Sequence, residues 1–143
     1  MRKILMLTCG VLMISSVVIA EEETVDTTCA GGAGTILMGK SGYKYCMSKN
    51  QMNWWNAVAW CDGLKDKSGA TKRLFDLKRD CACSETTANC ASKTCSELAG
   101  VSSSSVWTVT PASGDVAYRV DLSSGTIYNH YAGRSYYHYS LCK

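Results

Sequence analysis

The stretch between residues 128 and 139 has the most unusual composition of the chain, because tyrosines, both histidines, an asparagine and an arginine gather there. Tyr and His present flat faces and polar tips at small entropic cost, so this composition is typical of protein-recognition surfaces. A set of ordinary cross-strand aromatic pairs would explain the same pattern, since alternate tyrosines of a strand must turn inward. The candidate ligand-binding residues are Tyr128, Asn129, His130, Tyr131, Arg134, Tyr136, Tyr137, His138 and Tyr139.

The two histidines also permit a metal-binding interpretation. A hairpin about Gly133 would place His130 and His138 near a diagonal on one face, but no carboxylate joins them locally. A hydrolase would need a nucleophile elbow or a histidine beside a buried acid, and the sequence has neither pattern. We therefore expect no enzyme activity, no metal site and no cofactor.

Cysteines are the second group with chemical potential. The chain has nine, and without Cys9 of the apolar leader the rest form an even set. An even set in a small exported chain predicts disulfides in an oxidising compartment. A zinc site is not favoured, because the chain has no Cys-x-x-Cys pair and no histidine near residues 81 to 95. The residues expected to form disulfides are Cys29, Cys46, Cys61, Cys81, Cys83, Cys90, Cys95 and Cys142.

The segment from residue 78 to residue 105 is rich in Cys, Ser, Thr and Ala and has too little apolar mass for a core of its own. Local bridges must therefore hold it. Cys81 and Cys83 are too close to pair easily with each other, so each should reach Cys90 or Cys95. The sequence leaves both connectivities open.

The N-terminal segment is predicted to be a secretory signal peptide. A basic start precedes an apolar run, residues 4 to 19, that is short for a membrane span, and Ala20 offers a cleavage point. A retained N-terminal anchor is the alternative. The expected organisation is a signal peptide at 1–20, a flexible lead-in at 21–28 and one domain at 29–143 with a Cys-rich insertion at 78–105. The chain without its leader is close to neutral and has no basic stripe, so we expect no nucleic-acid partner and no membrane span.

The elements that must position these residues begin with a Trp-rich stretch at residues 53–64, which predicts one short helix capped by Asn53. Apolar side chains occupy most of its circumference, so we expect the helix to be covered on several sides. The residues expected to face water are Asn56, Asp62 and Gly63. A second short helix is expected at residues 94–100, which begin with the form of a capping box and end in a glycine.

Strand patterns lie on either side of these helices. Residues 35–38 and 43–47 flank a turn composition and predict a hairpin, which a bridge between Cys29 and Cys46 would join to the N-terminus. The C-terminal part predicts an antiparallel meander of strands at 106–110, 116–122, 126–131 and 135–142, with the first strand stopping at Pro111.

This order of elements resembles the C-type lectin-like fold, in an exported bacterial protein. The motifs that carry the resemblance are Trp55-Asn56-Ala57 with Cys61 in the first helix, Val106-Trp107-Thr108 at the start of the strand block, and Ser140-Leu141-Cys142 at the end. The resemblance implies an α+β domain, a disulfide from the first helix to the last strand at Cys61 and Cys142, and the hairpin bridge at Cys29 and Cys46.

The same resemblance argues against calcium. Family members that bind sugar through calcium use a Glu-Pro-Asn or Gln-Pro-Asp loop and a Trp-Asn-Asp strand, which supply converging oxygens. This chain has its only proline in Thr110-Pro111-Ala112, and Trp107 is followed by Thr108 and Val109. A calcium site is therefore not expected.

Three functions are consistent with these patterns. The first is a secreted, periplasmic or surface-exposed binding module that recognises a protein or glycan through its Tyr/His/Asn-rich C-terminal surface. The second is a structural or adhesive subunit of a cell-envelope assembly. The third is a ligand-binding protein varied by a diversity-generating system, because Tyr, Asn, His, Ser and Arg between residues 128 and 140 are the residues that randomised Asn codons produce.

Overall fold

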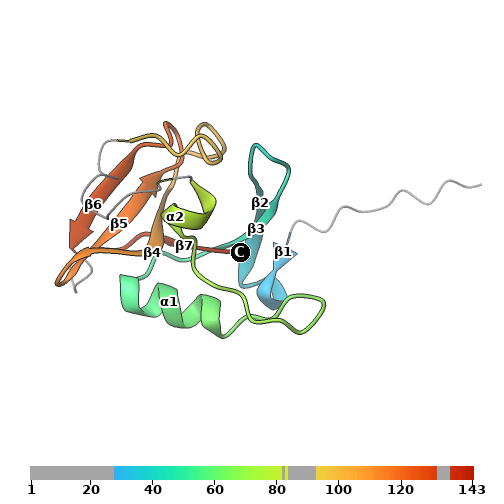
Figure 1. Cartoon of the computed structure of the whole chain (residues 1–143). Coiled ribbons are helices and arrows are strands. Elements are labelled where there is room, and N and C mark those ends of the chain that lie inside the picture. The colour runs from blue at the N-terminus through green and yellow to red at the C-terminus, as the bar shows by residue number, and fades with distance from the viewer. Residues whose placement is uncertain (1–27, 82, 84–92, 132–135) are drawn as a thin grey trace, which may run out of the picture.

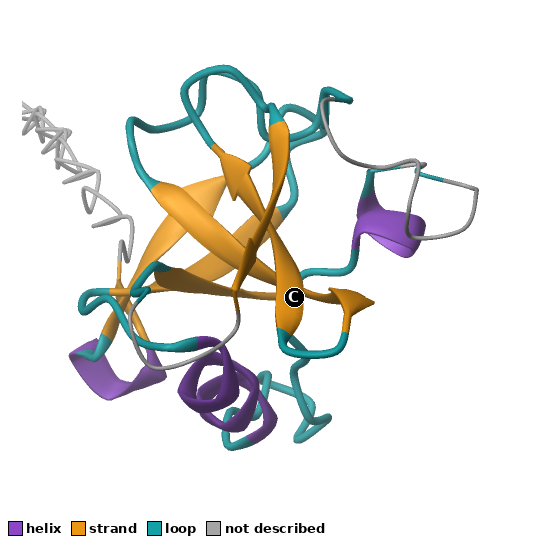
Figure 2. Ribbon diagram, turned by 90° about the vertical axis from the view of Figure 1, so that its left-hand side faces the viewer, coloured by secondary structure: helices purple, strands orange, loops and turns teal. Residues whose placement is uncertain are grey.

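The computed structural model describes residues 28–81, 83, 93–131 and 136–143 (Figure 1). These residues form an α+β structure in which a mixed seven-stranded sheet carries two α-helices. The strand order is β1-β2-β3-β7-β4-β5-β6, and the sheet is strongly twisted (Figure 2). The strands are β1 (Thr28–Cys29), β2 (Gly34–Met38), β3 (Lys44–Ser48), β4 (Ser105–Ser113), β5 (Val116–Asp121), β6 (Ile127–Tyr131) and β7 (Tyr139–Cys142). The helices are the 3-10 turn η1 (Ala30–Gly32), α1 (Trp54–Asp62) and α2 (Leu77–Asp80). Thr28, expected at the end of the lead-in, already belongs to β1.

The N-terminal hairpin forms where the sequence predicts it. β2 and β3 pair antiparallel with Ile36 opposite Cys46, and Gly42 closes the turn between them with a φ of 84°. Gly34 admits no side chain, because a Cβ there would lie 2.6 Å from the sulfur of Cys29 and 2.9 Å from that of Cys46. The Cys29–Cys46 disulfide joins β1 to β3 across β2, and only a glycine at position 34 leaves room for it.

The terminal strand β7 lies in the centre of the sheet, so the last strand of the expected C-terminal meander is placed wrongly, whereas β4, β5 and β6 pair antiparallel in succession as predicted. β7 pairs antiparallel with β3, where Cys142 is opposite Cys46, and parallel with β4, where Ser140 is opposite Trp107. It also begins at Tyr139, later than expected. Residues 140–142 are fully buried, and a strand that is buried on both faces is most stable with a neighbour on each side.

β4 does not end at Thr110, as the sequence suggests, but continues through Pro111 to Ser113. Its register with β5 shifts on either side of Pro111. β7 pairs with β4 only at Val106 and Trp107, so Pro111 lies where one side of β4 has no strand in the described sheet. Proline is tolerated at such an edge and at a bulge, because no ladder hydrogen bond is lost there.

Each face of the sheet has its own apolar core. Val106 of β4 packs in one cluster with Leu77 of α2, whereas the next residue, Trp107, packs in another with Cys61 of α1. Side chains alternate between the two faces of a strand, so α1 and α2 cover opposite faces.

α1 is buried on one side only, which corrects the expectation of a helix covered on several sides. Asn53 caps it, since its side chain accepts a hydrogen bond from the Asn56 amide at 2.9 Å. Ala57 and Cys61 are completely buried, but Trp55 is 60% exposed. At 3.6 residues per turn, Trp55 lies on the opposite side of the helix from Ala57 and Cys61. The sheet covers only the side of the helix that carries Ala57 and Cys61.

The second helix is α2 rather than the expected helix at residues 94–100. Residues 96–100 form turns, and the backbone amide of Cys95 donates to the carbonyl oxygen of Gly125 at 2.7 Å. The Glu97 carboxylate does not cap a helix. It accepts hydrogen bonds from the Ser41 hydroxyl at 2.7 Å and from the Tyr45 hydroxyl at 3.2 Å. Tertiary contacts with the β2–β3 turn therefore replace the local capping box.

Three disulfides join described residues. The Cys29–Cys46 and Cys61–Cys142 bridges confirm the pairings that the resemblance implies. The third joins Cys81 to Cys95 and excludes the connectivity in which Cys83 takes Cys95. Cys83 is disulfide-bonded as well. The other cysteine of that expected set, Cys90, lies outside the described residues, as does the predicted signal peptide.

Within the described ranges no helix is both long and apolar enough to cross a membrane.

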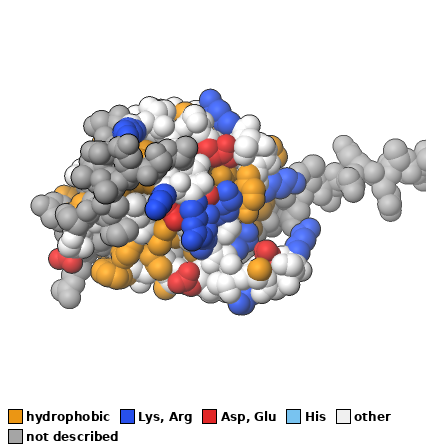
Figure 3. Space-filling model, in the orientation of Figure 1, with side chains coloured by type: hydrophobic (Ala, Val, Ile, Leu, Met, Phe, Trp, Pro, Cys, Tyr) orange, Lys and Arg blue, Asp and Glu red, His pale blue; other side chains and the backbone are white. Residues whose placement is uncertain are grey.

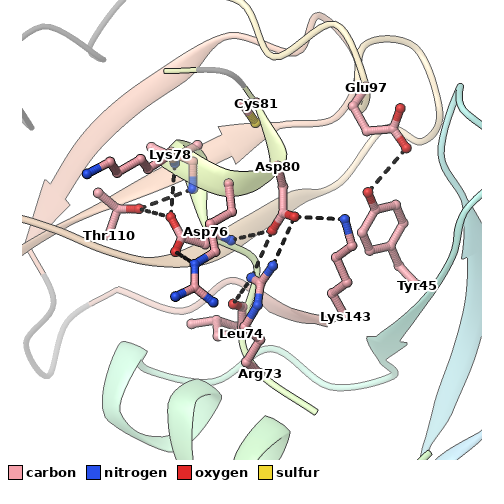
Figure 4. A network of polar contacts seen from close by, with 12 residues as sticks. Tyr45, Arg73, Leu74, Asp76, Lys78, Asp80, Cys81, Glu97, Thr110 and Lys143 are labelled. Carbon is pink, nitrogen blue, oxygen red and sulfur yellow. Dashed lines mark hydrogen bonds and ion pairs between the residues drawn. The ribbon is translucent and has the colours of Figure 1, made fainter. Parts of the chain in front are cut away.

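A buried carboxylate fixes the end of the chain to α2 (Figure 4). Asp80, with a side chain that is 1% exposed, accepts two hydrogen bonds from Arg73 at 2.9 and 3.0 Å and one from Lys143 at 2.8 Å. Burial alone would raise the pKa of Asp80, but the hydrogen bonds from Arg73 and Lys143 outweigh it and lower the pKa. Asp80 therefore stays ionised and holds both cations.

Candidate functional site

The N-terminal end of α1 meets the chain just before β7. Met52 and His138 form an antiparallel bridge, in which each backbone amide donates to the other residue's carbonyl oxygen at 2.9 and 3.1 Å. Because the bridge is antiparallel, Tyr137 lies alongside Asn53, the cap of α1. Residues that are far apart in sequence are thus joined by backbone hydrogen bonds.

Two indoles, one buried and one partly buried, support this junction. Trp107 is fully buried, donates its indole N–H to the carbonyl oxygen of Met52 at 2.8 Å and packs edge-on against the His138 ring at 4.7 Å. Trp54 donates its indole N–H to the carbonyl oxygen of Thr108 at 2.7 Å. Each indole satisfies its polar tip while its ring packs, so the backbone around it is held in one place.

Several large aromatic side chains remain exposed around this support. Trp55 is 60% exposed, Tyr137 52%, Tyr128 42% and Tyr136 38%. We call these four residues the aromatic surface. Trp55 packs edge-on against Trp54 at 4.7 Å, and a group of hydrophobic side chains is visible over the N-terminal end of α1 (Figure 3).

Tyr128 reaches the aromatic surface from the outermost strand. It lies opposite Arg119 in the β5–β6 ladder, and the Arg119 guanidinium stacks 4.6 Å from the centre of its ring. Arg119 is itself opposite Trp107, so all three side chains point to the α1 side of the sheet. Arg119 also donates to the Ser105 hydroxyl at 2.8 Å, which fixes the cation under Tyr128.

The structure separates the predicted binding tract into two parts. Residues 128–131 lie on β6 at the edge of the sheet and Tyr139 lies on central β7, with β5 and β4 between them. The hairpin about Gly133 that would have brought His130 and His138 together is therefore wrong. Among the described residues, no three His, Cys, Asp or Glu side chains are placed to hold a metal ion.

The individual residues differ in their surroundings. Asn129 is exposed on the side of β6 opposite to Tyr128, while His138 and Tyr139 are half-buried and pack against Trp107 and the α2-side core. His130 and Tyr131 belong to β6, where only their backbone is described, and Arg134 lies outside the described residues.

A diversified tract would require outward side chains. Ser140 does not meet this requirement, because it is fully buried and its hydroxyl donates to the carbonyl oxygen of Ala57 at 3.0 Å. Tyr139 packs against the core. Free exchange among Tyr, Asn and Ser at these two positions would disturb the packing.

Sequence reasoning missed Trp55, which it placed in the core. A signal was present: Trp55, Ala59 and Asp62 are spaced i, i+4 and i+7, so they share one helical face, and Asp62 predicts that this face meets water.

Comparisons with protein-family models, with curated proteins and with solved structures find no match for this chain. Its function must therefore be inferred from the residues of the aromatic surface and their supports.

Proposed function

We propose that this chain is an exported binding module with a C-type lectin-like fold, which recognises a protein or a glycan outside the cell through its aromatic surface and without calcium. The observation that carries the proposal is the exposure of Trp55, Tyr136 and Tyr137 beside a support of two hydrogen-bonded indoles, Trp107 and Trp54. Large exposed aromatic groups mark interaction sites far more often than isolated exposed residues do.

The covalent frame supports the fold. The bridge from Cys61 to Cys142 joins the first helix to the last strand, and the bridge from Cys29 to Cys46 joins the N-terminal strand to its hairpin. These are the two pairings that the family resemblance implies. A small domain with several disulfides also suits an oxidising, extracytoplasmic compartment.

The nature of the exposed side chains supports binding rather than catalysis. Trp and Tyr are enriched among residues that dominate binding energy, because their rings bury a large area with few rotatable bonds. Trp54 and the Met52–His138 bridge hold the backbone beneath them, so little order would need to be gained on binding.

The test is a screen of glycans and surface proteins with the oxidised protein, followed by affinity measurements on variants. Trp55→Ala and Tyr137→Ala should each weaken binding of the selected ligand by about 2 kcal/mol, which is roughly 30-fold. Met38→Ala is the matched control, because Met38 is 54% exposed on β2, away from the aromatic surface. Unchanged affinity in both aromatic variants would contradict the proposal.

The same surface could instead pack against a neighbouring subunit of an envelope assembly. Concentration-dependent oligomers of the wild type that disappear in the double variant Tyr136→Ala, Tyr137→Ala would favour that alternative. A monomer that binds a ligand from the screen favours the binding module.

A further inference from the structure

A pocket of about 500 Å³ opens beyond the C-terminal end of α1. It lies between β1 and η1, the β2–β3 hairpin and the loop that follows α1. Its volume is within the range of about 300 to 1,000 Å³ that is usual for small-molecule sites. None of the residues of the aromatic surface lines it.

The floor of the pocket is apolar. Ile36 of β2, Leu64 and the Cys29–Cys46 disulfide contribute to it. Ile36 is directly opposite Cys46 in the hairpin, so their side chains share the face of the sheet that is turned toward α1. Hydrocarbon placed on this floor would leave water without breaking a polar contact.

The rim of the pocket is basic. Lys44 from β3 and Lys65, Lys67 and Lys72 from the loop line it, against a single carboxylate, Asp66. The ion pairs of the described residues involve Arg73, Arg79 and Lys143, and none uses a lysine of this rim. Lys65 donates its ammonium group to the Thr71 hydroxyl at 2.6 Å, and Lys72 is close enough to Asp66 to help lower the pKa of that carboxyl. Four cations against one carboxylate at a single opening favour an anionic ligand.

Asp66 is engaged within its own loop. Its carboxylate accepts hydrogen bonds from the Ser68 hydroxyl at 2.6 Å, the Ser68 amide at 2.8 Å and the Ala70 amide at 3.0 Å. The Ser68 hydroxyl, followed by the backbone amides, lowers the pKa of Asp66. All three hydrogen bonds end on one oxygen, Oδ1, so this side of the carboxylate shapes the loop.

The loop that carries the lysines is ordered by its own hydrogen bonds. Lys65 pairs with Thr71 as an isolated bridge, the amide of Asp66 donates to the carbonyl oxygen of Ala70 at 2.9 Å, and that of Lys72 donates to the carbonyl oxygen of Leu64 at 3.0 Å. On the other side, the disulfide fixes β1 against the hairpin. A rim and floor that are held in advance lose little freedom on binding.

We propose that this pocket binds a single-chain amphiphile with an anionic head group. The alkyl part would cover Ile36, Leu64 and the disulfide, and a carboxylate or phosphate head would lie among Lys44, Lys67 and Lys72. The site is separate from the aromatic surface, because Trp55 lies in the first turn of α1 and the pocket lies beyond its end, after seven more helical residues or about 10 Å of helix.

Calorimetric titration of the full oxidised protein tests the proposal. Dodecyl phosphate and dodecanoate, each below its micelle concentration, should bind with a one-to-one stoichiometry and a dissociation constant of about 10 μM, and their relative affinities distinguish a phosphate head from a carboxylate head. Dodecyltrimethylammonium and inorganic phosphate should each bind about 100-fold more weakly, because the first carries a positive charge that the lysines repel and the second has no alkyl chain. Equal binding of the cationic amphiphile, or of inorganic phosphate, would overturn the proposal.

Variants locate the binding. The double variant Lys44→Gln, Lys67→Gln should lose about tenfold or more in affinity for dodecyl phosphate, since it removes two charge-assisted contacts. Lys40→Gln with Lys78→Gln is the matched control, because both lysines are exposed and neither lines the pocket. Trp55→Ala should leave the affinity for dodecyl phosphate unchanged. A negative result for the pocket can therefore be distinguished from a negative result for the aromatic surface. Equal loss in the control pair would show a nonspecific charge effect and contradict the site.

Discussion

The two ends of α1 are built in different ways. At the N-terminal end, Trp55 and Tyr137 are exposed near the buried indole of Trp107, and the contact that joins their segments connects Met52 with His138. At the C-terminal end, lysines of a short loop are ordered by hydrogen bonds within residues 64–72. Long-range packing therefore makes the aromatic surface, and local hydrogen bonds make the rim of the pocket. Substitutions that disturb the core should therefore disrupt the aromatic surface, whereas the rim of the pocket depends mainly on hydrogen bonds within its own loop and on the neighbouring disulfide.

Removal of a disulfide is expected to have the largest effect on stability. The two bridges should also affect the two ends of α1 differently. Cys61→Ser breaks a closure of 81 residues at the helix that both regions share, which is worth about 4 to 5 kcal/mol and should prevent accumulation of folded protein. Cys29→Ser opens a closure of 17 residues next to the pocket alone, worth about 3 kcal/mol.

Denaturant unfolding followed by near-ultraviolet circular dichroism gives the loss for Cys29→Ser, and the yield of folded protein after purification reports on Cys61→Ser. The Cys29→Ser variant should fold and keep ligand binding at the aromatic surface while its affinity for dodecyl phosphate falls. Failure of Cys29→Ser to accumulate as folded protein would show that the two ends are not independent.

Two tryptophans of the aromatic end sharpen the distinction between support and surface. Trp107→Ala removes a fully buried indole together with its hydrogen bond to Met52, so the free energy of unfolding should fall by about 3 to 5 kcal/mol. Trp55→Ala removes a mostly exposed ring and should change that free energy by about 0.5 kcal/mol or less. The comparison would be broken if urea titrations gave similar losses for both.

A change outside both regions should lower stability and leave both binding reactions intact. Asp80→Asn weakens the contacts to Arg73 and Lys143 on the α2 face, at a cost of about 2 kcal/mol, which is discounted because both cations are about a third exposed.

The pH dependence follows from the lowered pKa of Asp80. Ionised Asp80 stabilises the fold above the unfolded-state pKa of about 3.9, and this contribution is lost as the pH falls below about 4 through the folded pKa. Urea unfolding between pH 2 and pH 7 should show the difference between wild type and Asp80→Asn at neutral pH and its disappearance in acid. A difference that stays constant down to pH 2 would contradict the assignment.

Local patterns in the sequence were sufficient to predict several elements. The β2–β3 hairpin, the strand β5, the turn before β6 and the cap at Asn53 all follow from alternation, glycine-containing turns or capping chemistry, which act within a few residues. The Cys29–Cys46 bridge follows from the same local geometry, because the hairpin brings its own ends together.

Only the tertiary structure decided the rest. A short terminal strand such as β7 can pair with the last strand of the meander or lie between its first strand and the N-terminal hairpin with the same alternation, and the choice depends on burial of residues 140–142 from both faces. Glu97 could have capped a helix, but Ser41 and Tyr45 compete for its carboxylate from 56 and 52 residues away. Trp55 looked like a core residue because three tryptophans share one helix, and its exposure depends on the sheet covering one side of that helix only. In each case the deciding contact comes from a distant segment, and for β7 and Glu97 the residues nearby in sequence do not indicate it.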